Sequence, residues 1–493
     1  MKTIARFLGA AAILLASGTT ALSARTDLVL GVVLEPPHLD PTAGAAAAID
    51  EIVYANIFEG LTRIGPDGEV QPALAESWEI SEDGKTYTFK LREGAKFHDG
   101  TSFDAEDVKF TLDRARAEDS TNAQKVLFSA IDTVEVVDPA SVKVTLKHPQ
   151  GSFLWKMGWG DAVIVAPESA EGNKEKPVGT GPFRFENWAK GSSVTIARNP
   201  DYWGEPVALE KAEFRFIPDA AASVTALLSG DVQAFPNFQA GDALPQIQAD
   251  PRFEVVIGAT EGETVLAMNN SKEPFSNIKV RQAISHALNR DEIILGATSG
   301  NGAPIGSHFS PASPAYVDLT GTYPYDVERA KALLAEAGHP DGFSATLKLP
   351  PPPYARLGGE IIASQLREIG IEAEIVPMEW AQWLEQVFTN KDYDLTIVSH
   401  TEPNDINIYA RDDYYFGYDN PKLDAVMAEL ETTTDTAKRN ELFGQAQRII
   451  AEDAVNGFLF QLPKVGVWDA KLEGMWENAP IQATDLTKVH WAE

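Results

Sequence analysis

Residues 51–114 constrain the fold more than any other part of this 493-residue chain. Apolar side chains at near-helical spacing predict a helix over residues 50–60, with Gly60 as its C-terminal cap. Apolar and polar residues then alternate over residues 78–91 around a turn sequence at 81–84, which predicts an antiparallel hairpin. Asp104 can accept hydrogen bonds from the first N–H groups of a second helix, predicted to run through Arg114. This stretch therefore encodes mixed α and β structure, and none of it specifies a ligand.

Strand and helix patterns alternate along the rest of the chain, without repeats or low-complexity tracts. Alternating valines around a turn predict a second hairpin over residues 131–147, which extends the first sheet. Later segments predict helices over residues 280–294, 326–338, 358–370 and 436–452. They also predict strands over residues 371–376 and 393–398. This alternation is typical of a long mixed α/β protein with a doubly wound domain.

The N-terminus has the pattern of an export signal. Lys2 and Arg6 precede a short apolar run, and Leu22-Ser23-Ala24 offers a small residue for cleavage after Ala24. An uncleaved anchor is the alternative, but the run is shorter than the roughly 20 residues that a membrane helix needs. We therefore expect a signal peptide over residues 1–24 and a mature chain in the periplasm without membrane insertion.

Composition excludes several classes of partner and chemistry. The chain has no cysteine, so it forms no disulfide, offers no thiolate nucleophile and carries no lipid-modified cysteine. Its formal net charge is −31. Such a field repels nucleic acid and anionic lipid, so neither is expected as a partner. The acidity indicates either general solubility or attraction of a cationic ligand.

The sequence contains no familiar catalytic or metal-binding motif. The chain lacks the GxSxG, HExxH, GxxxxGK[ST] and GxGxxG patterns, so the sequence predicts that the protein is not an enzyme. Its eight histidines form no pair at ligand spacing on one element, which predicts no metal site and no cofactor. The sequence His98-Asp99-Gly100 could suggest a metal-binding pair, but Asp-Gly favours a turn.

Several separated segments resemble one known family. They are residues 51–114 and the sequences GTGPFRFENW, RNPDYWG, MNNSKEPFSNIKVRQAISHALNRDEII, YFGYDNPKLDAVMAEL and KRNELFGQAQRIIAEDA. Together they resemble the extracellular solute-binding proteins of family 5, the peptide and nickel type of periplasmic binding protein that serves ATP-driven (ABC) importers. The resemblance implies an α/β fold of two lobes joined by a hinge, of the large type II-like class, with an extra inserted domain.

The resemblance also implies a division of the chain and a mechanism. Lobe 1 would comprise residues 25–65, 177–262 and 468–493, the inserted domain 66–176, and lobe 2 residues 263–467. The C-terminal tail would return to an earlier sheet. A monomer would close around a solute that touches both lobes and deliver it to inner-membrane permease subunits.

Candidate ligand contacts follow from the same resemblance. On one lobe, Glu35 and His38 of EPPHLD would line the cleft. On the other, Arg356 lies where dipeptide-binding relatives carry an arginine-bearing stretch, and its guanidinium could grip a carboxylate. A solvated surface arginine is the alternative. Glu402 and Asp405 lie where relatives have an acidic loop, so either could receive an ammonium group or serve as a helix cap or turn.

Five further residues complete the candidate site. Ser399-His400 replaces the Gly-Trp of relatives, so His400 either faces the cleft or is a buried, hydrogen-bonded residue. The aromatic side chains that could stack on a ligand, or pack in the core instead, are Trp380, Trp383, Tyr414 and Tyr415. Short peptides are the expected ligands. An opine, a sugar conjugate or a chelated metal is the alternative within transport, and a secreted hydrolase is a more distant one.

Overall fold

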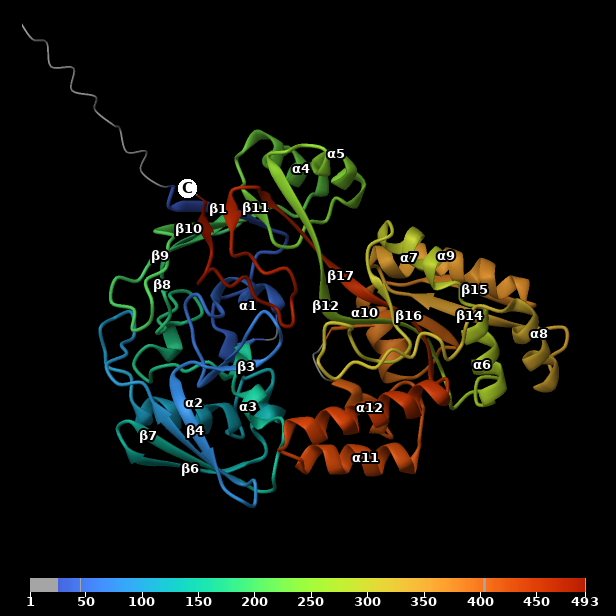
Figure 1. Cartoon of the computed structure of the whole chain (residues 1–493), viewed down its shortest axis with the longest axis horizontal. Coiled ribbons are helices and arrows are strands. Elements are labelled where there is room, and N and C mark those ends of the chain that lie inside the picture. Colours follow the sequence, from blue (N-terminus) through green and yellow to red (C-terminus); the bar gives the residue numbers. More distant parts are fainter. Residues whose placement is uncertain (1–24, 45, 402–404, 493) are drawn as a thin grey trace, which may run out of the picture.

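Two lobes are joined by a pair of long antiparallel strands in the computed structural model of the chain, which describes residues 25–44, 46–401 and 405–492 (Figure 1). The two strands are β12 (Phe253–Met268) and β17 (Asn456–Asp469). They pair from Phe253 opposite Asp469 to Ala267 opposite Asn456, with register shifts between Ala259 and Glu263 and between Thr264 and Val265. An irregular ladder bends and twists locally. This crossover is therefore the place where the lobes can hinge.

One mixed sheet runs through both lobes in the order β15-β14-β16-β12-β17-β11-β1-β10-β9-β8. In lobe 1 its strands are β1 (Asp27–Val32), β8 (Phe183–Ala189), β9 (Ser193–Arg198), β10 (Lys211–Phe216) and β11 (Ala234–Phe235). The helices of this lobe are α1 (Ala47–Val53), α4 (Ala220–Ser229) and α5 (Leu244–Gln248). Strands β1 and β10 are parallel and buried on one face, so they form the centre of this lobe's core.

The C-terminal segment packs back on lobe 1, as the resemblance implies. Strand β18 (Leu472–Glu473) pairs with β19 (His490–Trp491). The buried Asn56 side chain donates to the Thr484 carbonyl at 2.8 Å and accepts from the Leu486 N–H at 3.0 Å. This amide ties the tail to the segment that follows α1, and the Arg63–Asp485 ion pair adds a second link.

A separate four-stranded sheet forms the inserted domain, in the order β4-β5-β7-β6. Its elements are β4 (Ala75–Ile80), β5 (Thr86–Leu91), α2 (Ala105–Arg116), β6 (Ile131–Asp138), β7 (Ser141–Leu146) and α3 (Phe153–Lys156), preceded by the hairpin β2 (Thr62–Ile64) and β3 (Val70–Pro72). Asp104 caps α2 in a capping box with Asp107. Both predicted hairpins and the predicted cap are confirmed, because each depends on neighbouring residues.

Lobe 2 contains parallel strands with helical connections. Strand β14 (Phe343–Leu349) pairs in parallel with β15 (Ile371–Pro377) and with β16 (Leu395–His400). The remaining elements are α6 (Ile278–Ala287), α7 (Arg290–Thr298), β13 (Ala303–Pro304), α8 (Val327–Glu336), α9 (Pro353–Glu368), α10 (Trp380–Trp383), α11 (Pro421–Thr432) and α12 (Thr436–Glu452). Helices α11 and α12 approach the inserted domain across the gap between the lobes (Figure 1).

Two predictions about helices are wrong. Helix α1 ends at Val53 and does not reach Gly60. A Cβ on Gly60 would lie 2.6 Å from the Met157 carbonyl oxygen, so this glycine serves a close backbone approach instead of a cap. The helix predicted over residues 280–294 is two helices, because Asn289 caps α7 by accepting from the Glu292 N–H.

The prediction that His98 belongs to a turn is confirmed. Gly100 has a φ of +91°, and the Thr101 N–H donates to the Asp99 carboxylate at 3.0 Å. The His98 ring lies between the Gly181 carbonyl, 2.9 Å from Nε2, and the Gly179 N–H, which donates to Nδ1 at 3.2 Å. His98 therefore joins the inserted domain to lobe 1.

Candidate ligand-binding site

A cavity of about 380 Å³ lies between the two lobes. The hinge strand β12 and the β2–β3 turn form part of its wall, and the inserted domain adds Trp78 and Trp155. Lobe 2 contributes residues 312–315 and Arg439 and Phe443 of α12. Walls from both lobes are what a receptor that closes around a solute requires.

Three acidic side chains gather beside this cavity. Glu261, which lines it, and Glu263 both lie on β12. Glu263 stands opposite His400 in the β12–β16 ladder. Asp405 begins the 3-10 helix Asp405–Ala410, and its Oδ1 lies 2.7 Å from His308 Nε2. The strand register and the loop after β16 thus place side chains from distant parts of the sequence together.

Burial dominates the electrostatics of this cluster. It raises the pKa of Glu261 to about 7, and the Asp405 charge adds to that shift. It also raises the pKa of Glu263 well above its usual value, again with Asp405 and Glu261 adding to the effect. Burial lowers the pKa of His400 to about 4, although Asp405 opposes the shift. The free site therefore disfavours accumulated charge of either sign.

Hydroxyl groups hold His400 in place. Its Nε2 lies 3.1 Å from the Tyr415 hydroxyl and its Nδ1 lies 3.4 Å from the Tyr414 hydroxyl. Both tyrosines are buried in the core of lobe 2. Trp383, also buried, lies against Tyr415 with the ring centroids 5.8 Å apart. These aromatic residues form a rigid support behind His400, whereas Trp380 is 41% exposed at the surface.

Arg356 is held by backbone oxygens. It lies in the first turn of α9, whose first residue, Pro353, is the last of four consecutive prolines. Its Nε donates to the Pro350 carbonyl at 3.0 Å and its Nη2 to the Met378 carbonyl at 2.9 Å. Arg356 therefore ties two loops together, and its grip on a ligand stays a prediction.

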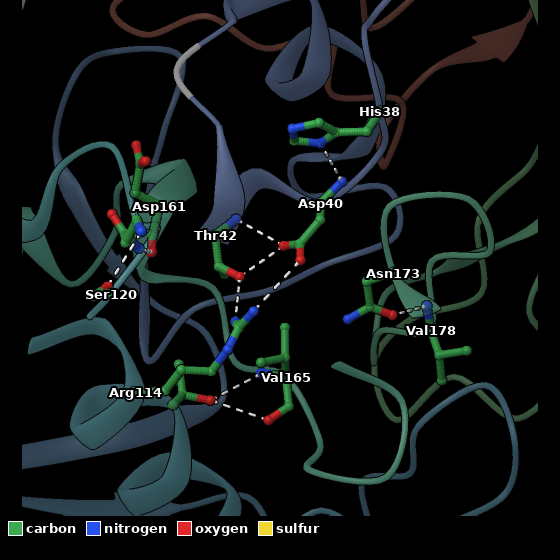
Figure 2. Close-up of polar contacts among 11 residues, drawn as sticks. His38, Asp40, Thr42, Arg114, Ser120, Asp161, Val165, Asn173 and Val178 are labelled. Atoms are coloured by element: carbon green, nitrogen blue, oxygen red, sulfur yellow. Dashed lines mark hydrogen bonds and ion pairs between the residues drawn. The ribbon is translucent and has the colours of Figure 1, made fainter. Parts of the chain in front are cut away.

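On lobe 1, the EPPHLD segment contacts helix α2 of the inserted domain (Figure 2). The buried Asp40 carboxylate accepts from the Thr42 N–H at 2.9 Å and from its hydroxyl at 2.7 Å. Arg114 of α2 donates to that hydroxyl at 2.7 Å and lies 3.9 Å from Asp40. His38 Nδ1 accepts from the Asp40 N–H at 3.3 Å. His38 is thus part of a structural network.

Glu35 also has partners within lobe 1. Its Oε1 accepts from the Trp188 indole at 3.0 Å and from the Gly191 N–H at 2.9 Å, in the β8–β9 turn. Glu402, in contrast, lies outside the described residues. Of the ten residues named as candidates, the structure brings five together, namely Trp383, His400, Asp405, Tyr414 and Tyr415.

Sequence reasoning missed Glu261, Glu263 and His308. The available signal was a pair of acids, two residues apart, at the start of the apolar stretch 264–268. Alternation places two such side chains on one face of a strand. Nothing local identifies His308, which reaches Asp405 across 97 positions of sequence.

Comparison with known proteins agrees with this architecture. The family model described as bacterial extracellular solute-binding proteins, family 5 Middle, matches residues 69–402. The chain belongs to this family. The glutathione-binding protein of Pectobacterium atrosepticum is 31% identical over 503 residues, covering 96% of this chain and 95% of the relative. The dipeptide-binding protein of Escherichia coli is 31% identical over 433 residues, covering 78% of this chain and 80% of the relative.

The fold matches solved structures of family 5 proteins closely. HbpA2 of Haemophilus parasuis superposes with a TM-score of 0.85 at 27% identity, covering 95% of this chain and all of that one. The expected family and fold class are thereby confirmed. Family 5 proteins bind solutes outside the cytoplasmic membrane for ABC permeases and are not enzymes. Across the part of the chain that the structure describes, no helix is long and apolar enough to cross a membrane.

Proposed function

We propose that this protein captures short peptides in the periplasm, as a monomer, and delivers them to the inner-membrane permease of an ABC importer. The names of its relatives support a peptide ligand, since they are a glutathione-binding and a dipeptide-binding protein. The predicted signal peptide supports the periplasm, although residues 1–24 lie outside the described residues. The proposed lobe boundaries fall within β12 and β17, the two strands that cross between the lobes.

The observation that carries this proposal is the charge pattern of the inter-lobe cavity. Its wall includes an acid, Glu261 on β12, and a base, Arg439 on α12. A free peptide is a zwitterion, with an ammonium group at one end and a carboxylate at the other. Buried charges need partners, because desolvating an unpaired charge opposes binding. An ammonium near Glu261 and a carboxylate near Arg439 would satisfy both ends of the peptide.

Closure would follow from contacts between the inserted domain and lobe 2. The Gly151 N–H donates to the Glu431 carbonyl at 2.9 Å, and the Gln150 amide donates to the Glu431 carboxylate at 2.9 Å. A solute that touches both lobes binds the closed form more tightly and shifts the population toward it. The closed form is then the one that the permease recognises.

The ligand can be identified directly. Protein purified without denaturation is analysed by native mass spectrometry, and the retained solute is released and sequenced. Di- and tripeptides are then compared by calorimetry with their N-acetylated and C-amidated forms. We expect free peptides to bind and each cap to weaken binding by at least about tenfold, because it removes a charge that the cavity pairs. Equal affinity for capped peptides, or a retained solute that is not a peptide, would overturn the proposal.

A pair of arginine variants tests the carboxylate contact. Arg439→Met should weaken binding of the free peptide by about 2–5 kcal/mol, as for truncation of one partner of a buried charge pair. The same variant should affect the C-amidated peptide much less. Arg448→Met on the same helix is the matched control, because Arg448 donates to the Gly444 carbonyl and does not line the cavity. Equal losses for both peptides would exclude Arg439, and Arg356→Met would then be tested in the same way.

A further inference from the structure

Three metal-ligating groups converge at the inner side of the acidic cluster. Donor atoms of Glu263, His308 and Asp405 all lie within 4.8 Å of one another. His308 Nε2 is 2.7 Å from Asp405 Oδ1 and 4.0 Å from Glu263 Oε2. Glu263 and His308 are buried and Asp405 is half-buried, so this is not a group of solvated surface acids.

The cluster leaves one buried acceptor unpartnered. Glu263 Oε2 has no hydrogen-bond partner and is shielded from solvent. Within the described part of the chain, His308 is the one basic side chain within ion-pair distance of Glu263, at the limit of 4.0 Å. A buried acceptor that faces a histidine and a second carboxylate, and that has no hydrogen-bond donor, is a position that a bound cation would stabilise.

A second layer of groups orients the histidine. The Tyr409 hydroxyl lies 3.1 Å from His308 Nδ1 and accepts from the Asn456 amide at 3.0 Å. A hydroxyl can donate to the ring nitrogen or accept from it, so Tyr409 can support either tautomer. With the proton on Nδ1, the lone pair of Nε2 faces the two carboxylates. Hydrogen bonds of this kind hold metal-binding histidines in position.

We propose that Glu263, His308 and Asp405 form a binding site for a divalent transition-metal ion, with zinc as the best fit to one imidazole and two carboxylates. Bonds of about 2.0–2.2 Å around a tetrahedral ion hold the donor atoms about 3.4 Å apart. That separation lies between the 2.7 Å and 4.0 Å found here, so small side-chain shifts suffice. Three protein ligands leave a position for water or for an atom of the solute.

A metal ion explains the composition of the cluster better than a peptide ammonium group does. An ammonium group donates hydrogen bonds and is satisfied by carboxylates alone, so it does not require the imidazole. The imidazole nitrogen is instead a preferred ligand of zinc. Histidine spacing within one element does not reveal this site. Its three residues come from β12, from the segment after β13 and from the start of the 3-10 helix Asp405–Ala410.

Titration with zinc alone tests the inference. Protein stripped with a chelator is titrated with ZnCl₂ by calorimetry, without peptide, so the result does not depend on the proposed function. We expect one ion per chain with micromolar or tighter affinity. Glu263→Gln and His308→Gln should each weaken it by at least about tenfold. The control is Asp50→Asn, which alters a buried carboxyl in lobe 1 that also has an unpartnered oxygen.

Absence of zinc binding, or equal binding by wild type and both site variants, would overturn the inference. A crystal of the wild-type protein with zinc gives a test that does not require the variants to fold. Anomalous density within bonding distance of Glu263, His308 and Asp405 would support the site. Density found only at exposed acidic residues would refute it.

Discussion

Gly151 is the position where one added methyl group should separate the lobes. It lies on the inserted domain against the loop between α11 and α12, and its N–H donates to the Glu431 carbonyl. A Cβ on Gly151 would lie 1.8 Å from the Thr433 carbonyl oxygen and 2.1 Å from Arg439 Nη1. Ordinary carbon–oxygen contacts are about 3.3 Å or longer, so the two surfaces must part by about 1.5 Å.

That separation breaks the contacts between the inserted domain and lobe 2 in the closed form. The Gly151–Glu431 backbone hydrogen bond contributes about 0.5–1.5 kcal/mol, and the Gln150 bond to the Glu431 carboxylate about 1.5–3 kcal/mol. Their loss should disfavour closure by roughly 2–4 kcal/mol. Because each 1.4 kcal/mol is a factor of ten, Gly151→Ala should weaken peptide binding by roughly 30- to 1000-fold.

Calorimetry with the peptide recovered from the purified protein measures the affinity, and small-angle scattering with saturating peptide measures closure. The control is Gly172→Ala in the same domain, where an added Cβ would meet nothing within 4 Å. We expect the control to behave as wild type. The reasoning would be refuted by a Gly151→Ala protein that binds within twofold of wild type and contracts by the same amount.

Three further predictions concern stability. Arg356→Met should lower the free energy of unfolding by about 1–3 kcal/mol in urea titrations, because two backbone carbonyls lose their donor; an unchanged midpoint would contradict this. Asn56→Ala should cost about 2–5 kcal/mol in the same assay, since it leaves buried backbone groups of the C-terminal tail unpaired. Burial raises the pKa of Asp161 to about 7, so the folded state loses stability as the pH rises from about 4 through 7. The Asp161→Asn protein cannot ionise at this position. Its melting temperature minus that of the wild type should therefore rise between pH 5 and pH 8. A difference that stays constant over this range would count against a buried acid at position 161.

Local chemistry explains which parts of the fold could be predicted. The β4–β5 turn and the Asp104 cap depend on residues within a few positions of one another, and both are present. Gly60 misled the prediction because a glycine can serve a cap or a close contact, and only the position of Met157 decides between them. Asn289 was read as part of a continuous helix, whereas its side chain caps a new one.

Some residues of the candidate site could likewise be predicted from local sequence, and others could not. His400, at the end of β16, and Asp405, at the start of the next 3-10 helix, were both identified from one short stretch of sequence, and the structure places them together. The partners of these residues come from elsewhere in the chain, and no spacing rule connects them. Glu35 and His38 were assigned to the cleft by resemblance, yet their hydrogen bonds in the described structure lie within lobe 1. Their role in binding stays a prediction.

Strand register links Ser399-His400, the pair that replaces the Gly-Trp of relatives, to the hinge. Ser399 and His400 stand opposite Thr264 and Glu263 in the β12–β16 ladder. A side chain at position 400 therefore shares its surroundings with the acid on the neighbouring strand, and a change at one position alters the burial and charge of the other. Since β12 also crosses between the lobes, a change at this pair would be expected to affect closure as well as the site. We therefore propose that specificity depends on the His400–Glu263 pair and its neighbours together, and not on the Ser399-His400 substitution alone.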